Sequence, residues 1–509
     1  MPRKSRLLLG LALSVAAALV ATGCSPSTPD APAAPETNLL AIGVQAPPNS
    51  LDPAQLHDGQ QRYVWASIYD TLLLSENDGT ISGGAAESWE YSDDALTLTL
   101  TLRDGMTFSS GADVDAEAVK VTLERTRDTA GPQQNNLSAI DSIDTPDPLT
   151  VVLNLSRTDP NLLVALSYGA GVITDPATID SDTLALDPVG SGPYTLNRDR
   201  STDGSVYVLE RRDDYWNVEA YPFTQITVRA ISDRTALFNT LLAGEVDAAS
   251  VDLTQAPQAE SSGLTLTTVE GISVGSLILA DRAGTVAPEL ADIRVRQAIN
   301  MAFDRQGIID AILLGNGSPG SQPFNPISPV YNDQLDDLYP FDPEAARELL
   351  ADAGYPNGFT LAMPANLVVM QFQPTITQSL ADIGITVQWD PVPASSSGQG
   401  TTWGAYFNYG SIAPASRISA LYYQANGSQN PFRYEDETVN ALLADVADET
   451  DLDIANETYR KLNDYTMEQA WFAPLFLQNT TWATADNVEY VGTSGSMPDI
   501  RVFGSPDGD

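Results

Sequence analysis

The sequence predicts a fold of the α/β class, built as two or three lobes, from three observations. The chain has 509 residues, whereas ordinary domains hold about 100–200 residues. Its 43% content of hydrophobic residues is enough to fill a substantial core. Strand-like alternation and helix-like spacing of apolar residues follow one another along the chain. Strands and helices are therefore expected to mix throughout, and no internal repeat is found.

The strand predictions come from apolar runs and from period-two alternation. Leu39 to Val44 is a short apolar run, and leucines alternate with threonines from Leu96 to Leu102. Such alternation is typical of a strand with one buried face, and Asp104-Gly105 supplies the turn after it. A second pair of strands is predicted at residues 149–155 and 205–211.

The helix predictions rest on apolar residues at helical spacing after a capping residue. Asp115, Asp292 and Asp342 each stand where a side chain can accept a hydrogen bond from the first helical turn. A proline follows Asp342, as is common at the first position of a helix. Other helices are predicted at residues 62–74, 435–447 and 455–470.

The first 37 residues are predicted to serve export and anchoring. A positively charged start precedes the apolar run Leu7 to Val20, which is too short for a membrane span of about 20 residues. Small residues then lead to Cys24, the only cysteine of the chain, in a pattern that resembles the bacterial lipobox. We expect a signal peptide at 1–23, a lipid on Cys24 and a flexible tether over 24–37. The alternative is a simple signal peptide with an incidental cysteine.

The charge of the chain excludes several classes of function. With 67 acidic and 25 basic residues, the net charge is −42. Such a surface repels phosphates, so we expect no binding to nucleic acid and no direct attraction to anionic lipid. Since no later apolar run approaches membrane length, membrane contact is expected through the lipid anchor alone.

Two glycine motifs invite a catalytic or nucleotide-binding interpretation, and their surroundings disfavour both. Gly271 to Gly275 matches GxSxG, but a second strand, rather than a helix, is expected after the serine. Gly315 to Gly320 matches GxGxxG, but a helix precedes it and prolines follow. The glycines at 315–320 are interpreted as a helix stop and a loop.

Metal and cofactor chemistry is not expected. The chain has one histidine, His57, and one cysteine, which cannot form a zinc or transition-metal cluster. The acidic run at 448–453 lacks the glycine and the spacing of a calcium loop. We therefore expect no cofactor, no metal and no catalytic residue.

An ordered set of motifs resembles the family 5 extracellular solute-binding proteins, the peptide, nickel and opine class of ABC-importer receptors. The strand–helix block at 85–125 resembles the family signature. Further matches follow in family order along residues 38–485: LDP at 51–53, VGSGPY at 189–194, LLAGEVDA at 241–248, DIRVRQAINMAFDR at 292–305 and DPEAARELLADAGYPNGF at 342–359.

The resemblance implies a two-lobed periplasmic-binding-protein-like fold with the ligand in a cleft between the lobes. Lobe I would comprise residues 38–272 and 478–509, with an extra subdomain at about 56–180, and lobe II residues 273–477. Closing lobes enclose a ligand by hinge motion, which suits residues at the ends of elements.

The function implied is that of a substrate-binding lipoprotein of an ABC import system. It would capture an oligopeptide or peptide-like solute outside the cell membrane and deliver it to permease subunits with their ATPase. We expect a monomer, lipid-anchored to the outer face of the membrane, that catalyses no reaction. The alternatives are a ligand sensor or adhesion lipoprotein with the same fold, and an extracytoplasmic hydrolase. The sequence does not decide among peptide, sugar, opine and chelate ligands.

The pocket is predicted to include an aromatic segment of lobe II and one residue of lobe I. Aromatic rings offer rigid contact area, and amide or phenol groups orient a ligand. Along the segment, alternate residues face opposite sides, so at least one set is expected to reach the cleft. The competing interpretation is that these rings fill the core. The predicted residues are Trp403, Tyr406, Asn408, Tyr409, Arg417 and Gln45.

One departure from the family pattern bears on the ligand. Peptide-binding members usually place an aspartate soon after a tryptophan in lobe II, where it holds the α-amino group, but residues 401–419 contain no acid. A buried ammonium without a partner is costly. The ligand is therefore expected to lack a free α-amino group, or another lobe supplies the charge. Arg417 would bind a ligand carboxylate or pair with a neighbouring acid.

Overall fold

The computed structural model describes residues 38–76, 80–366, 369–393, 399–447, 449–493 and 498–506. The signal peptide, Cys24 and the tether lie outside the described residues, so export and lipidation remain predictions. Of the helices described, none combines the length and the apolar character that a membrane span requires.

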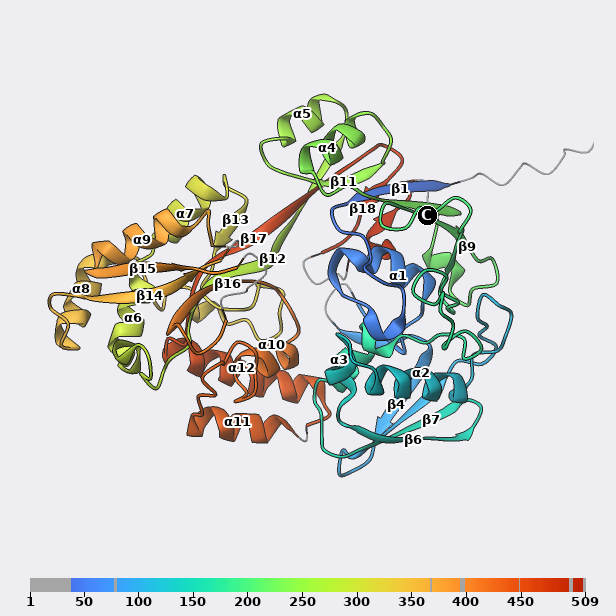
Figure 1. The fold of residues 1–509 in the computed structure, drawn as a ribbon, viewed down its shortest axis with the longest axis horizontal. Coiled ribbons are helices and arrows are strands. Elements are labelled where there is room, and N and C mark those ends of the chain that lie inside the picture. The colour runs from blue at the N-terminus through green and yellow to red at the C-terminus, as the bar shows by residue number, and fades with distance from the viewer. Residues whose placement is uncertain are drawn as a thin grey trace, which may run out of the picture. The chain divides into compact units, whose positions relative to one another are not determined.

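The largest sheet has nine strands and mixes parallel with antiparallel pairing (Figure 1). Its order is β16-β12-β17-β11-β1-β10-β9-β8, with β13 added beside β17. The predicted strand at Leu39–Val44 is confirmed as β1. The other strands are β8 Tyr194–Leu196, β9 Val206–Arg211, β10 Gln225–Ala230, β11 Ala248–Val251, β12 Thr265–Leu279, β13 Gly317–Pro319, β16 Ala405–Ser411 and β17 Phe472–Thr484.

Two long strands, β12 and β17, carry the chain from one half of this sheet to the other (Figure 1). The first five residues of β12, Thr265 to Val269, pair with the end of β17, which also pairs with β11. After a register shift between Val269 and Ser273, β12 lies between β17 and β16. The lobe boundaries expected after residues 272 and 477 fall near this shift, and their positions remain predictions.

A separate four-stranded antiparallel sheet, β4-β5-β7-β6, belongs to the first part of the chain. Leu98, Leu100 and Leu102 are buried in a core shared with α2, which confirms the predicted alternation for these three leucines, whereas Leu96 precedes β5 and is 37% exposed. The predicted cap is confirmed, because Asp115 Oδ1 accepts from the Ala118 N–H at 2.9 Å. The strands predicted at 149–155 and 205–211 are confirmed as β7 and β9. They do not pair with each other, because β7 pairs with β5 and β6 whereas β9 joins the large sheet. The elements are β4 Ala86–Tyr91, β5 Thr97–Leu102, α2 Ala116–Asp128, β6 Ile140–Asp147 and β7 Thr150–Leu155.

The helix predicted over 62–74 is shorter than expected. It forms α1, Arg62–Ile68, and the chain then continues into β2, Leu73–Ser75, which pairs with β3, Ile81–Gly83. The carbonyls of Thr71 and Leu72 accept hydrogen bonds from the backbone of residues 85 and 86, at 3.0 and 2.9 Å. Partners distant in the sequence thus take the backbone groups that a longer helix would use.

Helices cover both faces of the β16 end of the large sheet. One layer, α6 to α9 with the parallel pair β14-β15, packs against Phe407 and Phe476, and the other, α10 to α12, packs against Tyr406 and Phe472. The capped helices α6 and α8 are confirmed, and α11 and α12 begin within three residues of the predicted positions. The elements are α6 Ile293–Met301, α7 Arg305–Ile312, α8 Pro343–Asp352, β14 Phe359–Ala365, α9 Gln373–Asp382, β15 Ile385–Pro391, α10 Ala415–Tyr422, α11 Glu437–Ala447 and α12 Leu452–Glu468.

Short elements complete the described fold. The α-helices and strands are α3 Leu162–Leu166, α4 Arg234–Leu242, α5 Ala256–Ser261, β18 Glu489–Tyr490 and β19 Phe503–Gly504. The 3-10 turns are η1 Pro53–Gln55, η2 Gly59–Gln61, η3 Gln134–Leu137, η4 Gly169–Gly171, η5 Val218–Ala220, η6 Pro288–Ala291, η7 Asp333–Leu335 and η8 Ile500–Val502. The α/β class predicted from the sequence is confirmed.

Candidate ligand-binding cavity

A cavity of about 180 Å³ lies where β12 and β17 pass between the two halves of the large sheet. Amide and hydroxyl side chains make up most of its lining, and they come from both halves. Such groups both donate and accept hydrogen bonds, so the cavity suits a polar solute. Its lining consists of Gln45, Gln60, Arg234, Ser250, Val251, Asp252, Gln255, Ile272, Asn316, Tyr409, Gln478, Asn479, Thr480 and Thr481.

Amide side chains fix the two crossing strands beside this cavity. Gly271 has a φ of 61°, and its backbone N–H donates to Asn479 Oδ1 at 3.0 Å. Asn325 Nδ2 donates to the Gly271 carbonyl at 3.1 Å, and Asn316 Nδ2 donates to the Asn479 carbonyl at 3.1 Å. A Cβ atom at residue 271 would lie 3.2 Å from the Asn325 Cβ atom. Glycine is therefore favoured here by both conformation and space.

On the β1 side, one glutamine orders the loop that borders the cavity. Gln60 Oε1 accepts hydrogen bonds from the backbone N–H of Gln45 at 2.7 Å and of Ala46 at 3.2 Å. The turn η2 thereby holds the end of β1, and both glutamines line the same space. Side chains positioned in this way need little reordering when a ligand binds.

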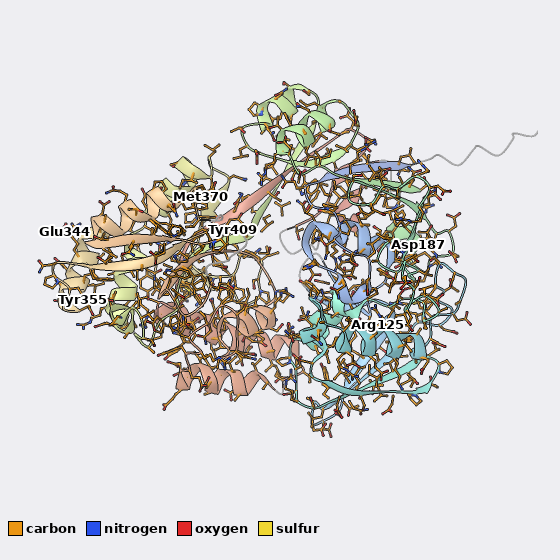
Figure 2. All side chains as sticks on the ribbon, in the orientation of Figure 1. Arg125, Asp187, Glu344, Tyr355, Met370 and Tyr409 are labelled. Carbon is orange, nitrogen blue, oxygen red and sulfur yellow. The ribbon has the colours of Figure 1, made fainter. Side chains whose placement is uncertain are left out.

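Tyr409 is the aromatic residue of the lining and extends from β16, beside β12 (Figure 2). It is 36% exposed, and its hydroxyl donates to Gln478 Oε1. Burial raises the pKa of the Tyr409 phenol, while the nearby Ser273 side chain and the positive charge of Arg234 lower it. The ring thus has one side on the packed strands and one side free for a solute.

One ion pair supplies the formal charges among the described residues that line the cavity. Arg234 Nη1, at the start of α4, donates to Asp252 Oδ1 at 2.5 Å, and the side chains are 64% and 43% exposed. The backbone N–H of Asp252 donates to Gln255 Oε1 at 3.0 Å. The lining therefore carries both signs of charge and is neutral as a whole.

Gln45 and Tyr409 are the two sequence-predicted residues that meet in the cavity. Trp403 and Asn408 instead contact protein groups: Trp403 Nε1 donates to Asp390 Oδ2 at 2.9 Å, and Asn408 Nδ2 donates to the Tyr422 hydroxyl at 2.8 Å. Neither residue lines the cavity. The binding role predicted for them is untested, and if the cavity is the solute site, Trp403 makes no direct contact with the solute.

Tyr406 lies in the core, with an exposed fraction of 0%, and its hydroxyl donates to Gln429 Oε1 at 3.0 Å. The expectation that one face of the aromatic segment reaches a cleft is wrong for residues 405 to 407. Ala405 and Phe407 are also buried, at 0% and 2% exposed, because helices cover both faces of β16. Only past Phe407 does the strand extend beyond this packing.

Arg417, on α10, stands near the first part of the chain rather than in the cavity lining. Its guanidinium carbon lies 5.8 Å from the centroid of the Tyr168 ring, within cation–π range. Next to it, Ser416 Oγ donates to Asn161 Oδ1 at 3.1 Å. Neither alternative predicted for Arg417, a ligand carboxylate or a neighbouring acid, is tested by this contact.

Several lining residues were missed by the sequence analysis, chiefly Gln60, Arg234, Asp252 and Gln478. They stand in or next to four different elements, η2, α4, β11 and β17, and each looks like an ordinary surface residue in its own segment. The aspartate cap before Arg234 marks a helix start, but a capping pattern carries no information about a ligand.

The motifs weighed for catalysis occupy ordinary structural positions. Ser273 lies inside the continuous strand β12, without the strand-to-helix turn of a hydrolase nucleophile. His57 is exposed on a loop, and its carbonyl accepts a hydrogen bond from Trp65 Nε1 at 2.9 Å. In the described part of the chain, no three His, Cys, Asp or Glu residues gather as metal ligands do. The expected absence of cofactor and metal remains a prediction.

Comparison with known proteins finds a matching family model and related proteins of similar length. The model of the bacterial extracellular solute-binding proteins, family 5 Middle, matches residues 80–432. The glutathione-binding protein GsiB of Salmonella paratyphi A is 27% identical over 501 residues, which cover 92% of this chain and 94% of that protein.

Two solved structures have the same fold. The binding protein AgaA of A. tumefaciens R10, in complex with agropinic acid, is 28% identical, with a TM-score of 0.72 over 90% of this chain and 97% of its own. The periplasmic binding protein DppA of Helicobacter pylori, in complex with the peptide STSA, is 24% identical, with a TM-score of 0.75 over 92% and 98%. These likenesses confirm the two-lobed binding-protein fold that the ordered motifs implied.

Proposed function

We propose that this chain, which belongs to the bacterial extracellular solute-binding proteins of family 5, captures an oligopeptide or peptide-like solute for an ABC importer. It would bind the solute outside the cell membrane and release it, chemically unchanged, to the permease subunits that work with an ATPase. The family membership supports solute binding, and the nature of the solute is the proposal.

The observation that carries this proposal is the composition of the cavity. Amides and hydroxyls from both halves of the large sheet line it, and Tyr409 adds one apolar ring. Peptide groups of a solute would find acceptors for their N–H groups and donors for their carbonyls in such a lining. Since leaving those groups unpaired in a buried site is costly, a polar lining selects for a solute rich in them.

The position of the cavity supports binding coupled to hinge motion. We propose that residues 38–272 and 478–509 form one lobe and residues 273–477 the other, and that both crossings bend beside the cavity. Gly271 and Asn479, which are hydrogen-bonded to each other, stand at those crossings. A solute held by both lobes would favour the closed form by as much as its contacts differ between the two states.

Ligands named for two of the three relatives agree with a peptide-like solute, whereas AgaA was solved with agropinic acid. GsiB is a glutathione-binding protein, and DppA was solved with the peptide STSA. Both ligands contain amide groups of the kind that this lining can hydrogen-bond.

Membrane attachment is proposed to run through a lipid on Cys24, with the chain acting as a monomer. Two or more acyl chains anchor a protein stably, since each buried methylene contributes about 0.8 kcal/mol. Cys24→Ala should yield an uncleaved precursor or a protein released into the medium, as read by mass spectrometry and membrane fractionation. Normal processing and membrane retention of the variant would contradict the anchor.

A thermal-shift screen of the full chain against peptides, opines, sugars and metal chelates tests the proposed function. A true ligand at a hundredfold excess over its Kd should add about 2.7 kcal/mol of stability. Mass spectrometry of the recovered ligand should show it unchanged. Stabilisation by a sugar or chelate alone, or conversion of a peptide to products, would contradict the proposal.

A further inference from the structure

The ion pair Arg234–Asp252 contributes little to the fold. Its two side chains are 64% and 43% exposed, and exposed pairs add little to folding stability. Arg234 occupies the first residue of α4, where the positive end of the helix disfavours a cation. Asp233 already caps this helix, accepting from the Ala236 N–H at 2.8 Å. Folding therefore gives no reason for an arginine at this position.

Both charges retain hydrogen-bonding capacity toward the cavity. Within the described residues, Arg234 donates through Nη1 and the Asp252 side chain accepts through Oδ1. A guanidinium has five donors and a carboxylate about four acceptor sites, so most of each group remains available to a solute. Arg234 also lies close enough to Tyr409 for its charge to affect that phenol. The pair thus shares the space of the aromatic residue from the other half of the sheet.

The geometry points to an α-amino-acid head group, with its ammonium on Asp252 and its carboxylate on Arg234, as the end of the solute that this pair binds. This inference rests on the proposed function and deepens it by naming one end of the solute. Arg234 Nη1 and Asp252 Oδ1 are 2.5 Å apart, so their ligand must carry its own opposite charges side by side. An ammonium and a carboxylate on one carbon have that arrangement, whereas the two ends of a linear peptide do not.

The head group keeps every charge balanced. Its carboxylate would bind the remaining N–H groups of Arg234 and its ammonium the remaining acceptor sites of Asp252, so two positive and two negative charges form one neutral cluster. A solute with only one of the two charges would add an uncompensated charge to the pair. The pair also provides, from the first half of the sheet, the carboxylate that residues 401–419 lack.

Three probes and two variants test the inference by calorimetry on the full chain. Glutathione carries an α-amino-acid head on its γ-glutamyl residue, N-acetylglutathione lacks the ammonium, and trialanine carries its charges at opposite ends. We expect the wild type to bind glutathione about tenfold or more tightly than either other probe. Arg234→Gln and Asp252→Asn should each weaken glutathione binding about 10- to 100-fold. Asp252→Asn should not weaken binding of N-acetylglutathione, which offers no ammonium.

The matched control is a second exposed ion pair outside the cavity lining. Arg198 Nη1 lies 2.7 Å from Asp203 Oδ1, with exposed fractions of 34% and 44%. Arg198→Gln should bind glutathione within about twofold of the wild type. Circular dichroism melting of all variants separates loss of binding from loss of fold.

Each outcome decides a different claim. If the wild type binds trialanine or N-acetylglutathione as tightly as glutathione, or if both cavity variants bind glutathione within about twofold of the wild type, the head-group inference is wrong and the proposed function stands. If the wild type binds none of the three probes, the peptide-like solute and the head group are both refuted.

Discussion

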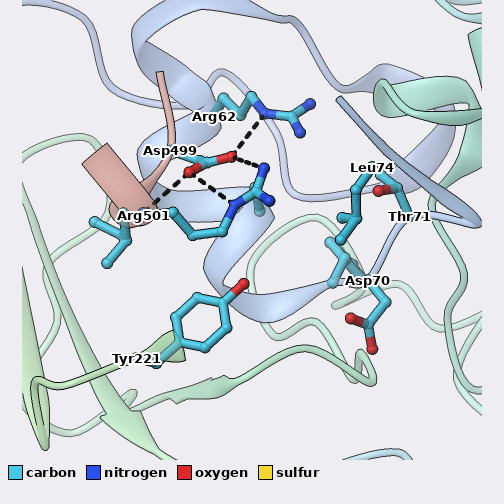
Figure 3. A pocket seen from close by; sticks show the side chains of 10 residues that line it. Arg62, Asp70, Thr71, Leu74, Tyr221, Asp499 and Arg501 are labelled. Atoms are coloured by element: carbon cyan, nitrogen blue, oxygen red, sulfur yellow. Dashed lines mark hydrogen bonds and ion pairs between the residues drawn. The ribbon is translucent and has the colours of Figure 1, made fainter. Parts of the chain in front are cut away.

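Two groups of arginine and aspartate in this chain have opposite surroundings. At the cavity, the Arg234 and Asp252 side chains are 64% and 43% exposed. Beside α1, Asp499 lies between Arg62 and Arg501, and these three side chains are 8%, 2% and 21% exposed (Figure 3). Asp499 Oδ2 is 3.8 Å from Arg62 Nε and 3.0 Å from Arg501 Nη2.

Packing, not solvent, surrounds the buried group. The Arg62 guanidinium lies 4.7 Å from the Trp65 ring centroid, and both of its Nη atoms donate to the Ser167 carbonyl at 3.4 Å. The space that the group borders is about 20 Å³, enough for about one water molecule. The comparison teaches that burial and fixed partners mark a structural ion group, whereas exposure and free donors in a cavity mark one available to a ligand.

The largest effect is expected where the buried group is broken. Asp499→Ala leaves the buried Arg62 without a carboxylate and leaves Arg501 with Glu76 alone, 3.6 Å away, so it should lower the free energy of unfolding by about 3–5 kcal/mol. Urea denaturation measures the loss, and ligand affinity of the folded fraction should be unchanged. A loss below about 1 kcal/mol would mean that this group resembles an exposed pair.

Asp70 lines the same small space, and its raised pKa predicts that the free energy of unfolding depends on pH. Burial raises its pKa from 3.8 to about 6, although the hydrogen bond that the Tyr215 hydroxyl donates to Asp70 Oδ1 at 2.7 Å and the charge of Arg212 lower it. The folded state therefore favours protonated Asp70, and this stabilisation, complete below about pH 4, is lost as the pH rises through about 6.

Asp70→Asn, which is neutral at every pH, should gain stability relative to the wild type between about pH 4 and pH 7, by up to roughly 3 kcal/mol. Chemical denaturation of both proteins at the two pH values checks whether the variant gains stability over the wild type as the pH rises. If the free energies of unfolding of variant and wild type differ equally at both pH values, Asp70 does not titrate in this range.

At the crossing strands we expect an intermediate effect. Gly271→Ala should cost about 1–3 kcal/mol, since it combines a positive φ with the close approach of Asn325. Gly105→Ala is the matched control, because Gly105 has a φ of 76° and open space around it. If both substitutions lower the free energy of unfolding equally, space at Gly271 is not limiting.

The smallest effect on folding is expected at the cavity pair. Arg234→Gln and Asp252→Asn should each change the free energy of unfolding by less than about 1 kcal/mol, because the pair is exposed. Denaturation without ligand measures this. A loss as large as that of Asp499→Ala would remove the contrast between the two groups.

Local signals in the sequence were sufficient for much of the fold. The caps at Asp115, Asp292 and Asp342 depend only on residues within the same helical turn, and each formed as predicted. The end of α1 and the partners of β7 depended on strands distant in the sequence, and both were predicted wrongly. Periodicity reports which face of an element is buried, but it does not report the neighbour that buries it.

The candidate site was predictable only in part for the same reason. Gln45 and Tyr409 were found because one follows a strand and the other ends an aromatic segment. Tyr406 belongs to the same aromatic segment as Tyr409, but its ring is buried against the helices α10 to α12. Arg234 and Asp252 become neighbours only when α4 and the end of β11 fold together.

Two aromatic residues of one segment provide the most direct test of the cavity as the solute site. Tyr409 lines the cavity, whereas Trp403 is hydrogen-bonded to Asp390. Calorimetry with a solute from the thermal-shift screen should show that Tyr409→Ala weakens binding about tenfold or more, while Trp403→Ala binds within about twofold of the wild type. Loss of binding in Trp403→Ala, with wild-type affinity in Tyr409→Ala, would contradict the account and place the solute elsewhere.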